Sequence, residues 1–377
     1  MRLNLRELPV LISTRHCRKL SSNIHACPSA LPQAAYCILS GRRLLAVSGP
    51  DSTRYLQGAV TVNVPNEKGP TGFYSAFLMP QGRVLYDVFI YPFKEVEGKY
   101  EGEEGWLIEV DAEEIENLAK RIRRYRLSSK FEVRILPETE RRVWSVWGDK
   151  DKKLRNPPSL DSFITINHAG GDIACLDNRA VGMGYRLLLT GNKKPELEIE
   201  ECHEDCYRLR RYLKGVPEGQ HEILKEQALP QESNIDFMGG IDFRKGCYMG
   251  QELTIRTHHR GVVRKRILPL QIYHADEKEP SEISFQSRSR LEAENIPINS
   301  IIDRLDKKGR GAGKWLAGMG NLGLGLCRIA EITKTVAENE TGSFKAGDEF
   351  KIEWGDVESK NMVKVKAFIP DWHAEKL

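Results

Sequence analysis

The stretch KGCYMGQE, residues 245–252, places a single cysteine, Cys247, between a lysine and two glycines. Glycine adopts backbone conformations that are costly for other residues, so this composition is typical of a loop. Arg244 and Lys245 lie three and two residues before the cysteine, and positive charge favours the thiolate, the form in which sulfur binds metals. A buried cysteine that only fills space is the competing interpretation, since free cysteine is commonly buried. The charged and glycine neighbours favour a reactive or metal-binding sulfur.

The composition is that of an ordinary globular protein. The 377 residues are enough for two or three domains, with 40% hydrophobic and 29% charged residues. The formal net charge of +4 is mild and says little about nucleic acid. No apolar run approaches the roughly 20 residues that a membrane-spanning helix needs. The eight cysteines are too sparse and irregular for a disulfide framework in a chain of this length.

The N-terminal stretch differs from the rest of the chain. Residues 1–33 contain several arginines among leucine, serine and alanine, and Glu7 is the sole acidic residue before Asp51. A basic, serine-containing, acid-poor segment is typical of a mitochondrial presequence. The alternative is a disordered basic arm of a cytosolic protein. We therefore predict a presequence over residues 1–33 and a location in the mitochondrial matrix.

The folded part is expected to begin near residue 36, with a mixture of strands and helices up to residue 265. Two strand-like runs, 73–79 and 83–91, flank the turn residues Pro80-Gln81-Gly82 and predict a hairpin. Asp87 lies in the second run among apolar residues, and periodicity leaves two interpretations open. The carboxylate is either paired or functional in a buried position, or it lies on the wet face of an alternating strand. A helix is predicted over about 203–214, ended by Gly215.

The C-terminal third, residues 266–377, has a different sequence pattern from the strand–helix mixture that precedes it. Residues 274–312 are rich in serine and charged residues with little periodicity, which predicts an exposed polar insertion. After it, short strands alternate with glycine-containing turns and no helix is expected, a pattern typical of a small β-barrel or sandwich.

Three local patterns point to other functions and are discounted. ECHEDC, with Cys202 and Cys206, has no second cysteine–histidine pair nearby, and its spacing also fits one face of the predicted helix. The glycines at 318, 320 and 323 have a spacing like GxGxxG but do not open a βαβ unit, so we expect no dinucleotide site. The basic segment 256–266 lacks the interleaved aromatic residues or motif of a nucleic-acid site.

Several blocks of sequence resemble one family. LPQESNIDFMGGIDF lies before the stretch KGCYMGQE, and LTIRTHHRGVVRKRILP follows it. Four further blocks match in order: SGPDSTRYLQGAVTVNV (48–64), AFLMPQGRVLYDVFIY (76–91), YRLRRYLKGVPEG (207–219) and GMGNLGLGLCR (318–328). Together they resemble the YgfZ-type proteins of the aminomethyltransferase-like superfamily, and are most similar to the mitochondrial iron–sulfur cluster assembly factors. The resemblance spans residue 36 to the C-terminus, apart from 274–312.

The resemblance implies an α+β fold. Its aminomethyltransferase-like body has two interleaved subdomains around a central channel, here residues 36–265, and a C-terminal β-barrel follows over 266–377. It also implies a role in maturing four-iron four-sulfur proteins together with A-type iron–sulfur carrier proteins. The motif cysteine that carries this role in the family is Cys247 here.

The number of cysteines near Cys247 sharpens this expectation. An iron–sulfur cluster is held by about four cysteine-type ligands, and no CxxC partner stands near Cys247. The simplest hypothesis is an iron–sulfur cluster shared between this chain and a carrier protein. We expect Lys245 and Arg256 to tune the charge of the site or to contact that partner. The remaining motif residues are expected to shape or hold the loop: Gly246, Tyr248, Gly250, Gln251 and Glu252.

Folate is a second implied ligand. Aminomethyltransferases of this superfamily bind tetrahydrofolate in the channel, with two adjacent acids on one strand. This chain has Tyr86 and Asp87 there, so one carboxylate is missing, and LRRYLKG lacks the acid of the pterin-binding helix. A folate-like ligand is still an option, with Tyr86 as an aromatic wall and Asp87 as an acceptor.

The sequence thus favours a non-enzymatic assembly factor. The alternatives are a tetrahydrofolate-dependent aminomethyltransferase and an interaction scaffold in which Cys247 is structural. We expect neither nucleic acid nor membrane insertion.

Overall fold

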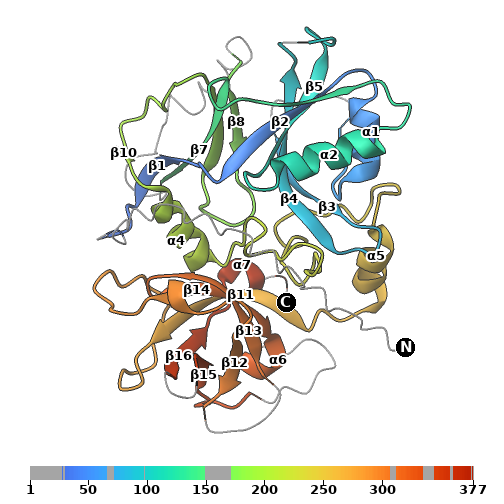
Figure 1. Ribbon diagram of the computed structural model, residues 1–377. Helices are drawn as coiled ribbons and strands as arrows, with labels where there is room; N and C mark the ends of the chain where they lie inside the picture. The colour runs from blue at the N-terminus through green and yellow to red at the C-terminus, as the bar shows by residue number, and fades with distance from the viewer. Residues whose placement is uncertain are drawn as a thin grey trace, which may run out of the picture.

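The computed structural model describes residues 28, 30–65, 72–96, 98–148, 171–305, 311–333, 344–356, 360–374 and 376. Two five-stranded sheets lie above a closed six-stranded barrel (Figure 1). Most of the predicted presequence, residues 1–27 and 29, lies outside the described residues. Among the residues described, no helix is both long and apolar enough to cross a membrane.

The first sheet contains the predicted hairpin and carries two helices. Its strands, in spatial order, are β3 (Phe73–Leu78), β4 (Val84–Lys94), β5 (Glu104–Asp111), β2 (Arg42–Ser48) and β6 (Glu132–Ile135). The helices are α1 (Ser52–Ala59) and α2 (Ile115–Tyr125). Strands β3 and β4 pair in antiparallel fashion, which confirms the hairpin. Leu56 of α1 and Leu118 of α2 are fully buried in the core that covers one face of this sheet.

The second sheet has the strand order β10 (Glu200–Glu201), β1 (Ala34–Ile38), β7 (Arg141–Gly148), β9 (Tyr185–Thr190) and β8 (Ile173–Leu176). Helix α4 (Glu204–Lys214) follows β10, close to the predicted bounds. Its N-cap is His203, and it ends at Gly215, whose φ of 67° lies in the left-handed region that glycine tolerates.

The two sheets are interleaved along the chain. Strand β1 belongs to the second sheet, β2 to β6 form the first, and the chain then returns to the second sheet with β7 to β10. One apolar core is shared between them and includes Ala35 and Trp147 from the second sheet and Ala46 and Phe89 from the first. This architecture confirms the predicted body of two interleaved subdomains.

The barrel closes in the order β11 (Lys265–Tyr273), β14 (Leu322–Arg328), β13 (Gly313–Met319), β12 (Ile301–Arg304), β15 (Phe350–Trp354) and β16 (Asn361–Ala367). Strand β16 pairs back onto β11, which confirms a C-terminal β-barrel. Three short helices accompany it: the 3-10 helix η1 (Ala293–Asn295), α6 (Ile329–Ile332) and α7 (Asp371–Ala374).

The exposed insertion predicted over 274–312 differs from the structure in its second half. Leu291, Ala293 and Ile296 are buried in the barrel core. Ile302 is also buried, and its strand, β12, joins β13 to β15 and so completes the barrel. These apolar residues are unevenly spaced among charged and polar ones, so they give no period that would reveal their burial.

The glycine pattern at 318–323 also has a structural explanation. A Cβ atom at Gly318 would lie 2.4 Å from Cζ2 of Trp315, and one at Gly323 would lie 2.2 Å from its Cη2. Trp315 is fully buried. The glycines therefore leave room for the indole ring inside the barrel.

Candidate functional site

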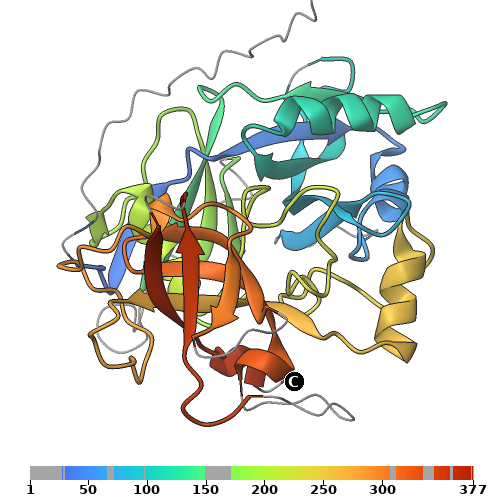
Figure 2. The same ribbon diagram turned by 60° about the horizontal axis from the view of Figure 1, so that its bottom comes forward.

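Cys247 lies on the loop 245–250, which leads into helix α5 (Gln251–Arg260). Figures 1 and 2 show α5 at the edge of the molecule. Among the described cysteines Cys247 is exposed and Cys202 is half-buried, whereas Cys37, Cys175, Cys206 and Cys327 are buried. Cys247 is thus accessible to a partner, as a sulfur that shares a metal centre with another protein must be.

The ammonium group of Lys245 fastens one side of this loop. Its Nζ donates hydrogen bonds to the backbone oxygens of Gln57, Val60 and Val62, at 2.8, 2.6 and 2.9 Å. These carbonyls lie at and just beyond the C-terminal end of α1, where helical carbonyls lack partners within the helix. Burial lowers the pKa of Lys245 to about 8. The sequence predicted that Lys245 would tune charge or contact a partner, whereas the geometry gives it an anchoring role.

The other side of the loop is fastened by the backbone. The amide of Met249 donates to the carbonyl of Gly58 at 3.0 Å, so both anchors converge on the same segment of α1. The amide of Tyr248 donates to Oε1 of Gln251 at 3.2 Å. The ring of Tyr248 is buried, and this burial raises its pKa to about 12. Between the anchors, Gly246 and Cys247 project into solvent.

The two motif glycines have different roles. Gly250 has a φ of 82°, and a Cβ atom there would lie 2.4 Å from the carbonyl oxygen of Met79 at the β3–β4 turn. A Cβ at Gly246 would meet nothing within 4 Å. Gly250 is therefore required for the loop to pack on the hairpin turn. The carboxylate of the exposed Glu252 makes no hydrogen bond with any described residue, which differs from the predicted loop-holding role.

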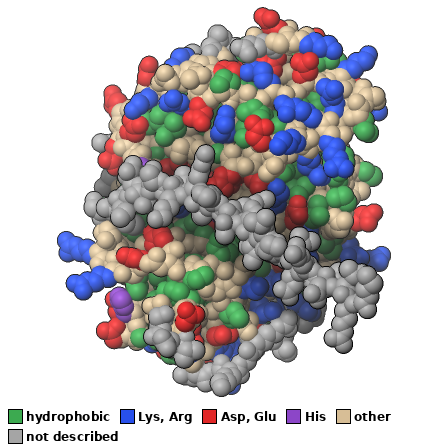
Figure 3. All heavy atoms as spheres, viewed as in Figure 1, with side chains coloured by type: hydrophobic (Ala, Val, Ile, Leu, Met, Phe, Trp, Pro, Cys, Tyr) green, Lys and Arg blue, Asp and Glu red, His purple; other side chains and the backbone are tan. Residues whose placement is uncertain are grey.

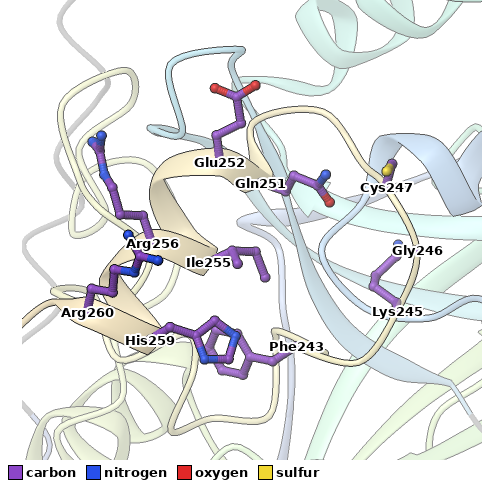
Figure 4. Close-up of a pocket in the computed structure, with 10 residues that line it drawn as sticks. All are labelled: Phe243, Lys245, Gly246, Cys247, Gln251, Glu252, Ile255, Arg256, His259 and Arg260. Atoms are coloured by element: carbon purple, nitrogen blue, oxygen red, sulfur yellow. The ribbon is translucent and has the colours of Figure 1, made fainter.

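A pocket of about 750 Å³ opens between this loop and α5. Figure 4 shows Cys247 on the loop at one end, with Arg256 and Arg260 on the helix at the other. The lining residues are Phe243, Lys245, Gly246, Cys247, Gln251, Glu252, Ile255, Arg256, His259 and Arg260. The sequence pointed to Arg260 only as positive charge after the cysteine, and Phe243, Ile255 and His259 were not predicted. The i, i+4, i+8 spacing of Glu252, Arg256 and Arg260 is a signal for one helix face that would have found Arg260.

The two residues proposed for folate, Tyr86 and Asp87, do not face the same space. Both are buried on β4, and successive side chains of a strand point to opposite faces. Tyr86 belongs to the core beneath α1 and α2, and Nζ of Lys225 lies 4.9 Å from its ring centroid. Oδ1 of Asp87 accepts hydrogen bonds from the amide of Gly219 and from Nε2 of Gln220, at 3.0 and 3.1 Å.

Asp87 belongs to a buried network of arginines and acids between the two sheets. Its Oδ2 lies 3.5 Å from Nη1 of Arg42. Arg42 also pairs with Glu109 at 2.9 Å, and Glu109 pairs with Arg186 at 2.7 Å. Burial raises the pKa of Asp87, and the charge of Arg42 opposes this shift. Further members of the network are Asp177, Arg179, Tyr207, Arg211, Glu218 and Glu222.

This network does not fit a folate site. The carboxylate of Asp87 is already held by Arg42, Gly219 and Gln220, and Tyr86 lies on the opposite face of the sheet. The choice left open by the sequence is thereby decided: Asp87 is fully buried and paired. The acid serves the interior of the fold, which gives no support to aminomethyl transfer.

The segment ECHEDC, residues 201–206, contributes two cysteines to a cluster near the core between the sheets. Cys202 lies next to both Cys37 and Cys206, and Cys37 and Cys206 are part of the core between the sheets. Across the part of the chain that the structure describes, no group of three or more histidine, cysteine, aspartate or glutamate side chains is arranged to hold a metal ion.

Comparison with known proteins agrees with this geometry. Residues 264–375 match the family described as "CAF17, C-terminal beta-barrel domain". The body and barrel superpose on the crystal structure of glycine cleavage system aminomethyltransferase T from Bartonella henselae with a TM-score of 0.59. That match covers 91% of this chain and 87% of the other at 14% identity, so it shows the fold alone. The chain thus combines an aminomethyltransferase-like fold with an exposed cysteine on a fastened loop.

Relatives of known name are much closer in sequence. The chain is 45% identical to the "Iron-sulfur cluster assembly factor IBA57 homolog, mitochondrial" of Chaetomium globosum, over 92% of this chain and 85% of the relative. It is 46% identical to the protein of the same name from Pyricularia oryzae, over 90% of this chain and 85% of the relative. The chain therefore belongs to the IBA57 family of mitochondrial iron–sulfur cluster assembly factors.

Proposed function

We propose that this protein supports the maturation of four-iron four-sulfur proteins in the mitochondrial matrix, with Cys247 as one ligand of a cluster shared with an A-type carrier protein. The observation that carries this proposal is the exposure of Cys247 on a loop fastened at both sides to α1. A fixed loop keeps the thiol in one place before the partner arrives, which lowers the entropy lost on binding.

The cluster is the cargo of this site and is held only in part by this chain. A cluster takes about four cysteine-type ligands, and Cys247 supplies one. The carrier would supply the others, and the cluster would pass on when the complex separates. Membership of the IBA57 family and the arginines that line the same pocket as the thiol support this assignment, because a thiolate-ligated cluster is an anion.

The N-terminal segment is proposed to be the import signal. Leu31 packs against the core, and the carbonyl of Pro32 accepts a hydrogen bond from Nε1 of Trp147 at 3.2 Å. Residues that pack in this way belong to the folded domain, so we propose that the presequence ends before Leu31.

The test is cluster formation in the complex. The chain and a cluster-loaded A-type carrier are mixed, and the visible absorbance of the cluster in the isolated complex is measured for the native protein and for Cys247→Ser. We expect the variant to lose the absorbance of the complex, and Cys202→Ser, the half-buried control, to retain it. Full absorbance with Cys247→Ser would exclude Cys247 as a ligand.

A cellular assay distinguishes the proposed function from the alternative of an interaction scaffold with a structural Cys247. If Cys247 were structural, Cys247→Ala would still restore aconitase activity in cells depleted of the native protein. We expect no restoration, together with a normal level of the variant protein.

A further inference from the structure

Helix α5 has few contacts with the rest of its own chain. Thr254 is its one fully buried residue, and Ile255 is half-buried. An isolated helix of ten residues is marginal in water. Its position at the edge of the molecule leaves its outer surface uncovered by the described part of the chain (Figures 1 and 2).

One face of α5 points toward the pocket that holds Cys247. Glu252, Arg256, His259 and Arg260 all line this pocket, and their spacing of i, i+4, i+7 and i+8 places them on a single helical stripe. Figure 4 shows the arginines beyond Ile255, at the end of the pocket away from the thiol. A segment lying along this stripe would reach the thiol of Cys247.

Three arginines on or next to this face have no ionic partner among the described residues, and Glu252 is the one acid that lines the pocket. Arg244, Arg256 and Arg260 are exposed and form no ion pair with any residue that the structure describes. The interior arginines differ, since Arg42 and Arg186 are both paired. Elsewhere, on the face shown in Figure 3, acidic and basic side chains are interspersed. Unpaired arginines beside a pocket raise the local positive potential and attract an anionic partner.

We propose that the groove between loop 245–250 and α5 binds an acidic segment of the protein that supplies the other cluster ligands, through Arg256 and Arg260. This inference rests on the proposed function, because it identifies the chemistry of the partner at the same site. Acidic side chains would pair with the arginines, steer the encounter and fix the register in which the partner's ligands meet Cys247.

The experiment measures docking without a cluster. The affinity of a cluster-free A-type carrier is determined for the native chain and for the charge-reversal variant Arg256→Glu/Arg260→Glu, at roughly 50 mM and roughly 300 mM salt. We expect the variant to bind about tenfold more weakly at low salt, and the difference to shrink at high salt as screening increases. The neutral variant Arg256→Ala/Arg260→Ala should show an intermediate loss.

The matched control is Lys120→Glu/Arg124→Glu, an exposed i, i+4 basic pair on α2 that carries the same change in net charge. Native-like binding by the Arg256/Arg260 variant, or an equal loss in the control, would overturn the proposal. The proposal would also be overturned if the Arg256→Glu/Arg260→Glu variant bound the carrier normally and lost binding only to a single-stranded oligonucleotide. Since no cluster is present, failure here is distinct from failure of Cys247 as a ligand, which the absorbance of Cys247→Ser reports. Thermal unfolding confirms that each variant is folded.

Discussion

The Nζ atom of Lys245 lies 2.6 Å from the carbonyl oxygen of Val60, which joins the cysteine loop to the segment that follows α1. Two further carbonyls share the same ammonium group, so all three of its hydrogens are used. The ammonium group of the lysine two residues before Cys247 is thus fully engaged by the backbone. Its contribution to the site is the position of the loop.

Replacing Lys245 with methionine tests this anchor. The variant leaves the three carbonyls without a charged donor, and we expect the free energy of unfolding to fall by about 1–3 kcal/mol. Cluster absorbance of the complex with a carrier should also fall, because Cys247 is no longer held. Urea unfolding and absorbance measure the two effects. Lys130→Met, on an exposed lysine, is the control; equal behaviour of the two variants would refute the anchoring role.

Gly250 and Gly246 make a matched pair of alanine substitutions. Gly250→Ala introduces a Cβ atom at a positive φ and 2.4 Å from the carbonyl oxygen of Met79. We expect a loss of stability of at least about 2 kcal/mol from backbone strain and the clash together. Gly246→Ala meets no atom within 4 Å and should stay within about 0.5 kcal/mol of the native protein. Chemical denaturation measures the free energy of unfolding of both variants, and similar losses of stability would contradict the different surroundings assigned to the two glycines.

The buried network predicts a large effect at Arg186. Arg186→Met removes one of the cationic partners of Glu109 and Glu218 in the interior, and leaves these acids paired only with Arg42, Arg179 and Arg211. Breaking a buried ion pair in this way costs about 3–5 kcal/mol. Thermal unfolding should show a strongly lowered midpoint, whereas Arg54→Met, on an exposed arginine, should change little. A native-like midpoint for Arg186→Met would show that the network adds no stability.

His373 predicts a dependence of stability on pH. Burial, with the charges of Arg266 and Lys376, lowers the pKa of His373 from 6.5 to about 3. Above pH 6.5 the imidazole is neutral in both the folded and the unfolded chain, so it adds no dependence there. As the pH falls from about 6.5 to about 3, the unfolded chain takes up a proton that the folded chain does not, and stability is lost.

His373→Leu should therefore lose less stability than the native protein over that range. Urea unfolding measured at several pH values between 6.5 and 4 tests this, with the exposed His274→Leu as a control expected to follow the native curve. Identical slopes for His373→Leu and the native protein would rule out the histidine as the cause.

Features that depend on residues close together in the chain agree with their prediction from sequence, whereas features that depend on residues far apart in the chain do not. The hairpin of β3 and β4 and the helix α4 were predicted well, because turn residues and a terminal glycine act over a few positions. The role of 291–304 in the barrel was missed, since its apolar residues follow no period. The partners of Lys245 lie more than 180 residues away in the chain, at Gln57, Val60 and Val62, and no local pattern reveals them.

The sequence by itself determined that Cys247 stands in a charged, glycine-containing loop, because these properties depend only on neighbouring residues. It also carried the family resemblance and the count of cysteines that points to a shared cluster. The tertiary structure alone decided that Asp87 is buried against Arg42, that Lys245 anchors the loop on α1, and that Arg256 and Arg260 face the thiol's pocket. The physical reason is that strand register and the interleaving of two sheets bring together residues that are remote in the chain.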